Sequence, residues 1–135
     1  MKCGKKKIRQ IEKKIVSVLS PDLLNSKWAK LVKESDVAGT GHCYIASESA
    51  YHLLGGKANG WQHMALNHDR WNDGLDEGET HHYIVNRESG EIVDPTWEQF
   101  GNEKIPYEVG IPCGFLTGER PSKRCLIVLD KVKSI

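Results

Sequence analysis

The segment from Gly39 to Gly56 constrains the fold more than any other part of the chain, because a glycine-punctuated loop leads directly into a helical pattern. After Cys43, apolar and small residues recur at helical spacing. They are Tyr44, Ile45, Ala46, Ser49, Ala50, Leu53 and Leu54. The pair Gly55-Gly56 follows this run, as a C-terminal cap would. The pattern predicts a helix over 44–54 that carries Cys43 at its first turn.

A cysteine at a helix N-terminus has an unusual chemical environment. The unpaired backbone N–H groups and the positive end of the helix dipole stabilise its thiolate, which is the form that attacks a carbonyl carbon. A free cysteine is otherwise most often a small buried residue, so the position of Cys43 alone leaves both interpretations open. The catalytic interpretation requires a histidine partner.

The second informative segment predicts a β-hairpin. Residues 80–85 and 91–96 are rich in Tyr, Ile, Val and Thr, and the polar stretch between them, which contains a glycine, has the composition of a turn. An even-numbered loop places Asp94 on the same sheet face as His81, and His82 then points to the other face. An odd-numbered loop or a bulge would bring His82 to Asp94 instead.

Together these residues resemble the transglutaminase-like branch of the papain-like cysteine hydrolase superfamily. The resemblance rests on Gly-His-Cys ending at Cys43, then His81, then Asp-Pro-Thr beginning at Asp94, and it covers about the middle half of the chain. It implies that Cys43 is the nucleophile, His81 the general base and acid, and Asp94 the residue that orients His81. His82 is the fallback base.

The chain also departs from that family. Transglutaminases usually have His-x-Trp after a tryptophan-rich cysteine motif, whereas here Tyr83 occupies the aromatic position and His42 precedes the cysteine. The sequence is also similar to short phage-encoded proteins that share Gly-His-Cys-Tyr, Asp-Pro-Thr and the Gly-Phe-Leu-Thr motif beginning at Gly114. This second resemblance implies no substrate. A phage-encoded protein of this kind would act in the host cytoplasm.

The length and the element patterns predict one α+β domain. A chain of 135 residues forms one core, so we expect N-terminal helices in 1–38 and a catalytic core in 39–135. The helices would pack on a small antiparallel sheet. The family resemblance adds a papain-like core with the nucleophile at a helix N-terminus.

Several other segments have recognisable patterns. An apolar stripe with charged residues outside it predicts an amphipathic helix within 1–20, and Ser20-Pro21 predicts the start of a second helix that continues through residue 32. The pattern of 97–101 is typical of a helical turn, and that of 105–109 indicates an edge strand with a proline. The residues from Ser122 onward favour a capped helix, although 126–128 would also suit a strand.

Residues 55–80 predict a loop with one short helix near Gln62–Asn67, because their periodicity is weak. A loop between the nucleophile and the base is in a position to form a wall of the substrate cleft. The candidates for substrate binding are aromatic and histidine side chains in or next to these motifs: His42, Tyr44, Trp61, Trp71 and His82. The alternative is that Trp61 and Trp71 complete the core.

Composition restricts the expected partners and compartment. A formal net charge of +1 gives no reason to expect nucleic acid, and the absence of a long apolar run argues against a membrane. The four cysteines, at positions 3, 43, 113 and 125, show no Cys-x-x-Cys spacing, and no signal peptide is recognisable. We therefore expect reduced thiols and a cytoplasmic protein, and the oligomeric state stays open.

The number of histidines suggests a metal-binding alternative. The side chains that would bind zinc are His42, Cys43, His63, His68, His81 and His82. Their spacing does not match a zinc motif, and Cys113 lacks the second cysteine of the deaminase pattern. We therefore expect neither a metal nor another cofactor. Cys43 with His81 is the pair that remains for the alternative.

The predicted function is that of a cysteine-dependent hydrolase or acyltransferase that cleaves an amide, isopeptide or thioester bond through a covalent acyl-enzyme. Its substrate would be a peptide, an isopeptide or a small amide. The backbone N–H of Cys43 would supply one oxyanion donor, and Asn25, Gln62 and His42 are candidates for the second. The alternative is a catalytically silent binding module, such as a phage-type decoy or ligand sponge, that uses the same cleft.

Overall fold

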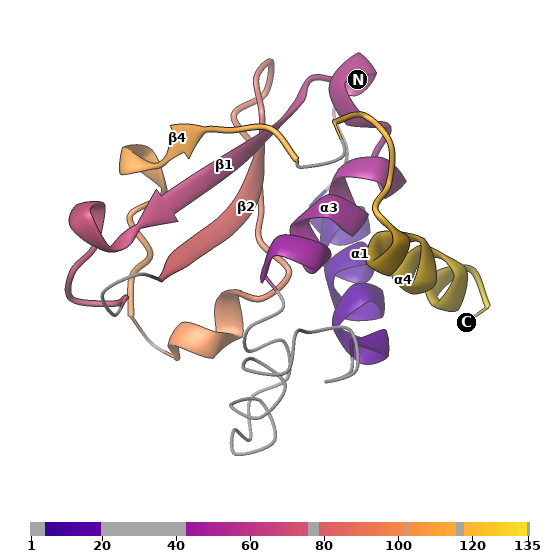
Figure 1. Cartoon of the computed structure of the whole chain (residues 1–135), viewed down its shortest axis with the longest axis horizontal. Helices are drawn as coiled ribbons and strands as arrows, with labels where there is room; N and C mark the ends of the chain where they lie inside the picture. Colours follow the sequence, from indigo (N-terminus) through magenta and orange to yellow (C-terminus); the bar gives the residue numbers. More distant parts are fainter. Residues whose placement is uncertain (1–4, 20–42, 76–78, 102, 116–117, 135) are drawn as a thin grey trace.

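The computed structural model describes residues 5–19, 43–75, 79–101, 103–115 and 118–134. In these ranges the fold is α+β, with three α-helices and a four-stranded antiparallel sheet (Figure 1). The helices are α1 (Lys5–Val18), α3 (Cys43–Leu53) and α4 (Lys123–Lys133). The strands are β1 (Trp61–Asn67), β2 (Thr80–Asn86), β3 (Ile92–Val93) and β4 (Ile111–Pro112).

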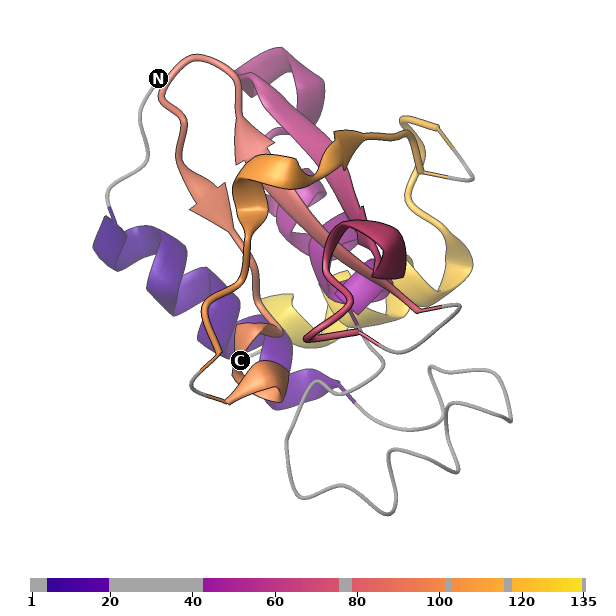
Figure 2. The same cartoon turned by 90° about the vertical axis from the view of Figure 1, so that its left-hand side faces the viewer.

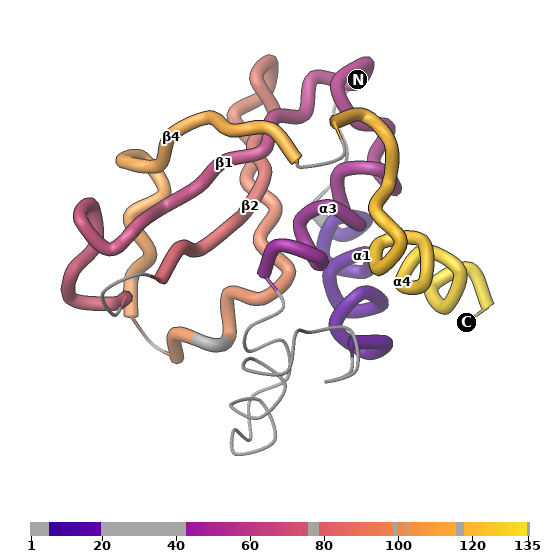
Figure 3. The backbone as a smooth tube through the Cα atoms, viewed as in Figure 1, coloured from indigo at the N-terminus to yellow at the C-terminus, as the bar shows by residue number. Residues whose placement is uncertain are grey.

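The strands lie in the order β3-β2-β1-β4, so the two long strands form the centre of the sheet (Figure 3). In the β2–β3 hairpin, Ile84 lies opposite Val93 and Val85 opposite Ile92. The backbone N–H of Asn86 donates to the carbonyl of Glu91, which closes a loop of residues 87–90. The loop is therefore even-numbered, and the register predicted from the sequence is confirmed.

The two faces of the sheet bury different cores. On one face, strand residues such as Trp61, Ile84 and Val93 pack against the three helices, which lie together on this side in Figure 1. On the other face, Leu66 and Tyr83 pack against aromatic and aliphatic side chains of the connecting segments. Because neighbouring strand residues point to opposite faces, adjacent residues of β2 belong to different cores.

Each helix is held by an apolar stripe. Ile8 and Ile15 of α1 are buried, and α1 lies next to the β2–β3 hairpin (Figure 2). In α4 the residues Cys125 and Val128 are buried at helical spacing, and the Ser122 hydroxyl caps the helix by accepting the N–H of Cys125. The predicted amphipathic helix within 1–20 and the predicted C-terminal helix are both confirmed.

Two predicted elements are wrong. The expected short helix at 62–67 is strand β1, because its backbone is paired on both sides, with β2 and with β4. The expected edge strand at 105–109 contains a 3-10 turn, Tyr107–Val109, and the edge strand is β4, whose proline suits an edge. The helical turn at 97–101 is confirmed as the 3-10 helix Trp97–Phe100.

The helix expected from Ser20-Pro21 through residue 32 lies outside the described residues. None of the helices in the described part of the chain combines the length and the apolar character needed to cross a bilayer.

Candidate functional site

Helix α3 holds Cys43 against the start of β2. Cys43 is the first residue of the helix and is half-buried, and its thiol donates to the backbone carbonyl of Thr80 at 3.7 Å. One turn further along, the buried Ser47 hydroxyl donates to the carbonyl of His82 at 2.9 Å, which fixes the helix on the strand. The N–H groups of the first turn have no intrahelical partner, so the helix N-terminus favours negative charge at Cys43.

His81 and Asp94 form a buried pair across the β2–β3 hairpin. His81 Nε2 lies 2.7 Å from Asp94 Oδ2, and the two residues are only 1% and 3% exposed. Asp94 directly follows the two-residue strand β3, so the hairpin register brings its carboxylate to the face of His81. The sequence predicted this pairing from the even-numbered loop.

His81 also interacts with Cys43. Burial by itself lowers the pKa of His81, but the hydrogen bonds and charges of Asp94 and Cys43 outweigh it and raise that pKa to about 9. Because Nε2 is bonded to Asp94, the nitrogen that remains for Cys43 is Nδ1. The imidazole is therefore a stronger base than that of a free histidine, and it stands between a carboxylate and a thiol.

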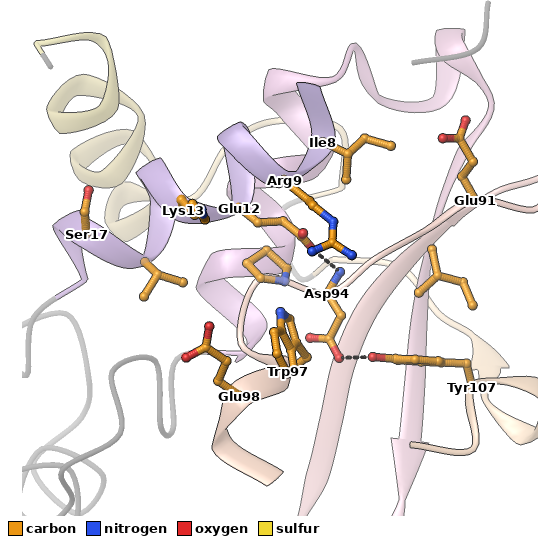
Figure 4. A pocket seen from close by; sticks show the side chains of 13 residues that line it. Ile8, Arg9, Glu12, Lys13, Ser17, Glu91, Asp94, Trp97, Glu98 and Tyr107 are labelled. Atoms are coloured by element: carbon orange, nitrogen blue, oxygen red, sulfur yellow. Dashed lines mark hydrogen bonds between the residues drawn. The ribbon is translucent and has the colours of Figure 1, made fainter. Parts of the chain in front are cut away.

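A second layer of contacts fixes Asp94 (Figure 4). The hydroxyl of Tyr107 donates to Oδ2 at 2.7 Å, and the backbone N–H of Asp94 donates to Glu12 Oε2 of α1 at 2.9 Å. Burial, together with the Asp94 charge, raises the pKa of Tyr107, so its hydroxyl stays a donor. Oδ1 of Asp94 is buried without a hydrogen-bond partner in the described part of the chain.

Glu12 lies at the edge of a pocket of about 590 Å³ next to this pair. Burial is the main cause that raises its pKa to about 7, and the charge of Asp94 adds to it, whereas the hydrogen bond from the Asp94 backbone lowers it. Arg9, Trp97 and Tyr107 also line this pocket (Figure 4). Helix α1 therefore supports Asp94 of the His81–Asp94 pair through Glu12.

His82 lies on the opposite face of the sheet from His81. Its Nδ1 is 2.9 Å from His63 Nε2, and burial together with the neighbouring histidines lowers its pKa to about 3. Tyr44 packs edge-on against both of these imidazole rings. The structure therefore groups Tyr44 and His82 with His63 and does not place them beside Asp94.

The two predicted cleft tryptophans are core residues. Trp61 is 3% exposed and packs under the helices at the end of β1 remote from Thr80. Trp71 is 9% exposed and packs in the other core against Phe100. Both side chains are almost fully buried, so the alternative role, completing the core, fits both, and Trp61 also lines a pocket together with Cys113.

Of the candidates for the second oxyanion donor, Gln62 is the one that the structure describes, and it is not brought to Cys43. The side-chain amide of Gln62 donates to the carbonyls of His63 and Cys113, away from the start of β2. Asn25 and His42 lie outside the described residues.

Sequence reasoning missed the two residues that support Asp94. The sequence pattern predicts an edge strand at Tyr107, and Glu12 belongs to the charged side of α1, which the helical pattern assigns to solvent. Only the packing of α1 on the hairpin reveals the role of Glu12.

The chain was compared with protein families, curated proteins and solved structures. No family model, no curated protein and no solved structure matches it.

Proposed function

We propose that the protein is a cysteine-dependent hydrolase or acyltransferase with a papain-like core, acting on an amide, isopeptide or thioester bond. One observation carries the proposal: His81 is bonded through Nε2 to the buried Asp94 carboxylate at 2.7 Å and interacts with the helix-terminal Cys43 on its other side. This is the order of nucleophile, base and orienting acid that covalent acyl transfer requires.

The chemistry follows from the protonation state of His81. With a raised pKa, the imidazole accepts the Cys43 proton and leaves a thiolate, which attacks the carbonyl carbon of the substrate. The imidazolium then donates its proton to the departing amine or thiol, and an acyl-thioester with Cys43 remains. Neutral His81 next takes a proton from water or from an acceptor nucleophile, which attacks the thioester and releases Cys43. The backbone N–H of Cys43 is one donor for the oxyanion.

The other thiols in the described part of the chain suit this chemistry less well. Cys125 is fully buried against Ser49, and burial raises its pKa to about 12. Cys113 lies 3.2 Å from His63 Nδ1, but the other nitrogen of His63 is engaged by His82 and not by a carboxylate. Among the cysteines that the structure describes, only Cys43 combines a helix N-terminus with an acid-oriented histidine.

The experiment that tests the proposal looks for the acyl-enzyme. The reduced protein is incubated with panels of peptide amides, isopeptides, glutamine-containing peptides and thioesters, and intact-mass spectrometry followed by peptide mapping records any adduct. We expect an acyl adduct on Cys43 with at least one class. Cys43→Ser is the matched control and should form no thioester.

A protein that only holds a ligand would give a different result. Cys43→Ala protein recovered from its native host would retain a small molecule or peptide, and the wild type would retain the same species uncleaved and without an adduct. That outcome would contradict the catalytic proposal and favour a binding module.

A further inference from the structure

A second cluster of chemically reactive side chains lies on the helix-facing side of the sheet. His63 Nε2 is 2.9 Å from His82 Nδ1, and His63 Nδ1 is 3.2 Å from Cys113 Sγ. One ligand atom from each of the three residues can be chosen so that all lie within 4.8 Å of one another. The cluster is separate from the Cys43 site, because His81 and His82 point to opposite faces of β2.

The strand register assembles this cluster from three strands. The backbone N–H of Cys113 donates to the carbonyl of His63 at 3.0 Å, so Cys113 continues β4 beside His63 on β1. His82 pairs with Ala65, two residues along β1 from His63, and therefore shares its face. His63 and His82 lie on different strands and Cys113 directly follows a third, so no short spacing in the sequence indicates the cluster.

Aromatic side chains hold the cluster in place. The ring of Phe115 stacks on His63 with centroids 3.9 Å apart, and Tyr44 packs edge-on against both histidines. His63 is 1% exposed, and with Cys113 it lines a pocket of about 350 Å³. His63 and Cys113 thus lie at a pocket, and the aromatic rings pack against the two histidines.

We propose that His63, His82 and Cys113 form a zinc-binding site. Imidazole nitrogen and thiolate sulfur are the ligands that Zn²⁺ prefers, at about 2.0–2.3 Å, so tetrahedral ligands lie about 3.3–3.7 Å apart. The two short contacts use different nitrogens of His63, and only one of these can bind the ion. One contact therefore opens by about half an ångström, and the third ligand atom, which lies within 4.8 Å of the other two, closes in to meet that geometry. Three protein ligands leave a fourth position for water or a small ligand from the pocket, and the ion would tie β4 to β1 and β2.

A neighbouring cluster provides a contrast within the same molecule. Glu48, His52 and Cys125 also lie within ligand distance of one another. Both carboxylate oxygens of Glu48 are already bonded to Ser122, at 2.7 and 2.8 Å, and Cys125 contacts Ser49. Glu48 and Cys125 therefore hold α3 against α4, and we do not propose that this cluster binds metal.

The test uses Co²⁺ as a spectroscopic substitute for zinc in the reduced full-length chain after removal of metal by a chelator. We expect saturation at a single Co²⁺ per chain, with a thiolate-to-cobalt charge-transfer band in the near ultraviolet and tetrahedral bands in the visible, all abolished by Zn²⁺. Cys113→Ser should lose the charge-transfer band, and His63→Gln should lower the affinity by at least about a hundredfold, since even residues behind the ligands typically contribute 10–100-fold. Cys43→Ser and Cys125→Ser should retain the band.

A second measurement uses only the wild-type protein, so it does not require the variants to fold. Zn²⁺ should slow the alkylation of Cys113 by iodoacetamide by at least about tenfold, as read by peptide mapping, and should leave Cys43 unprotected. The proposal is overturned if the folded wild type shows no thiolate-to-cobalt band, or if the band survives in Cys113→Ser and is lost in Cys43→Ser. The second result would place the metal at the proposed catalytic cysteine.

Discussion

Replacing Glu12 by glutamine should stabilise the protein at alkaline pH, although it removes the charge of the carboxylate that accepts the Asp94 backbone N–H. The pKa of Glu12 is raised from 4.5 to about 7, chiefly by burial and also by the charge of Asp94. The folded state therefore binds the Glu12 proton more tightly than the unfolded chain does. The contribution of Glu12 to stability is therefore fully present below about pH 4.5, is lost as the pH rises through about 7, and stays absent above it.

The expected size follows from that pKa. A rise from 4.5 to about 7 corresponds to at most about 3 kcal/mol, and we reduce this to about 1–2 kcal/mol because Glu12 is only partly buried and its charge is screened by solvent. Glutamine keeps an oxygen that accepts the Asp94 N–H but carries no charge. The Glu12→Gln protein should thus gain about 1–2 kcal/mol at pH 8 and little at pH 4.5.

Chemical denaturation at these two pH values measures the free energy of unfolding of both proteins. Glu98→Gln is a suitable control, because Glu98 lines the same pocket and is exposed, and it should change stability by less than about 0.5 kcal/mol at either pH. A Glu12→Gln protein that is less stable than the wild type at pH 8, or that differs from it equally at both pH values, would refute the reasoning.

Two further predictions concern the catalytic face and the core behind it. Once a substrate is known, His81→Ala should lower turnover by at least about a hundredfold. His82→Ala should retain most of the turnover, because His82 is on the other face of the sheet. Steady-state kinetics measures both rates, and the reverse ranking would contradict the assignment of His81 as the base. Gly110→Ala should destabilise the protein by about 1–3 kcal/mol, because the added Cβ would overlap the Tyr83 hydroxyl. Gly114→Ala is the control: Gly114 has open space around it, so its substitution should leave the free energy of unfolding nearly unchanged in the same denaturation assay.

Sequence patterns predicted the elements that a few neighbouring residues determine. The glycine loop and helical spacing after Cys43, the serine cap at Ser122 and the turn composition of the hairpin each correspond to an observed element. The hairpin register also fixed which histidine meets Asp94, since side chains alternate along a strand. These features depend on a few neighbouring residues.

The rest depends on contacts between distant segments. Strand β1 lacks clear alternation, and it is a strand because β2 and β4 pair with both of its edges. Trp61 and Trp71 are aromatic residues in a polar segment, and only the positions of the two cores show that they are buried. The contact of Glu12 with Asp94 joins residues 82 positions apart.

The rate at which each cysteine reacts with iodoacetamide at mildly acidic pH tests the central claim most directly. The chelator-treated wild-type protein is sampled over time, and peptide mapping gives separate rates for Cys3, Cys43, Cys113 and Cys125. We predict that Cys43 reacts first and by a wide margin, because it lies at a helix N-terminus and beside His81, the base that accepts its proton. If Cys43 reacts no faster than Cys113, the Cys43, His81 and Asp94 assembly is not an activated nucleophile.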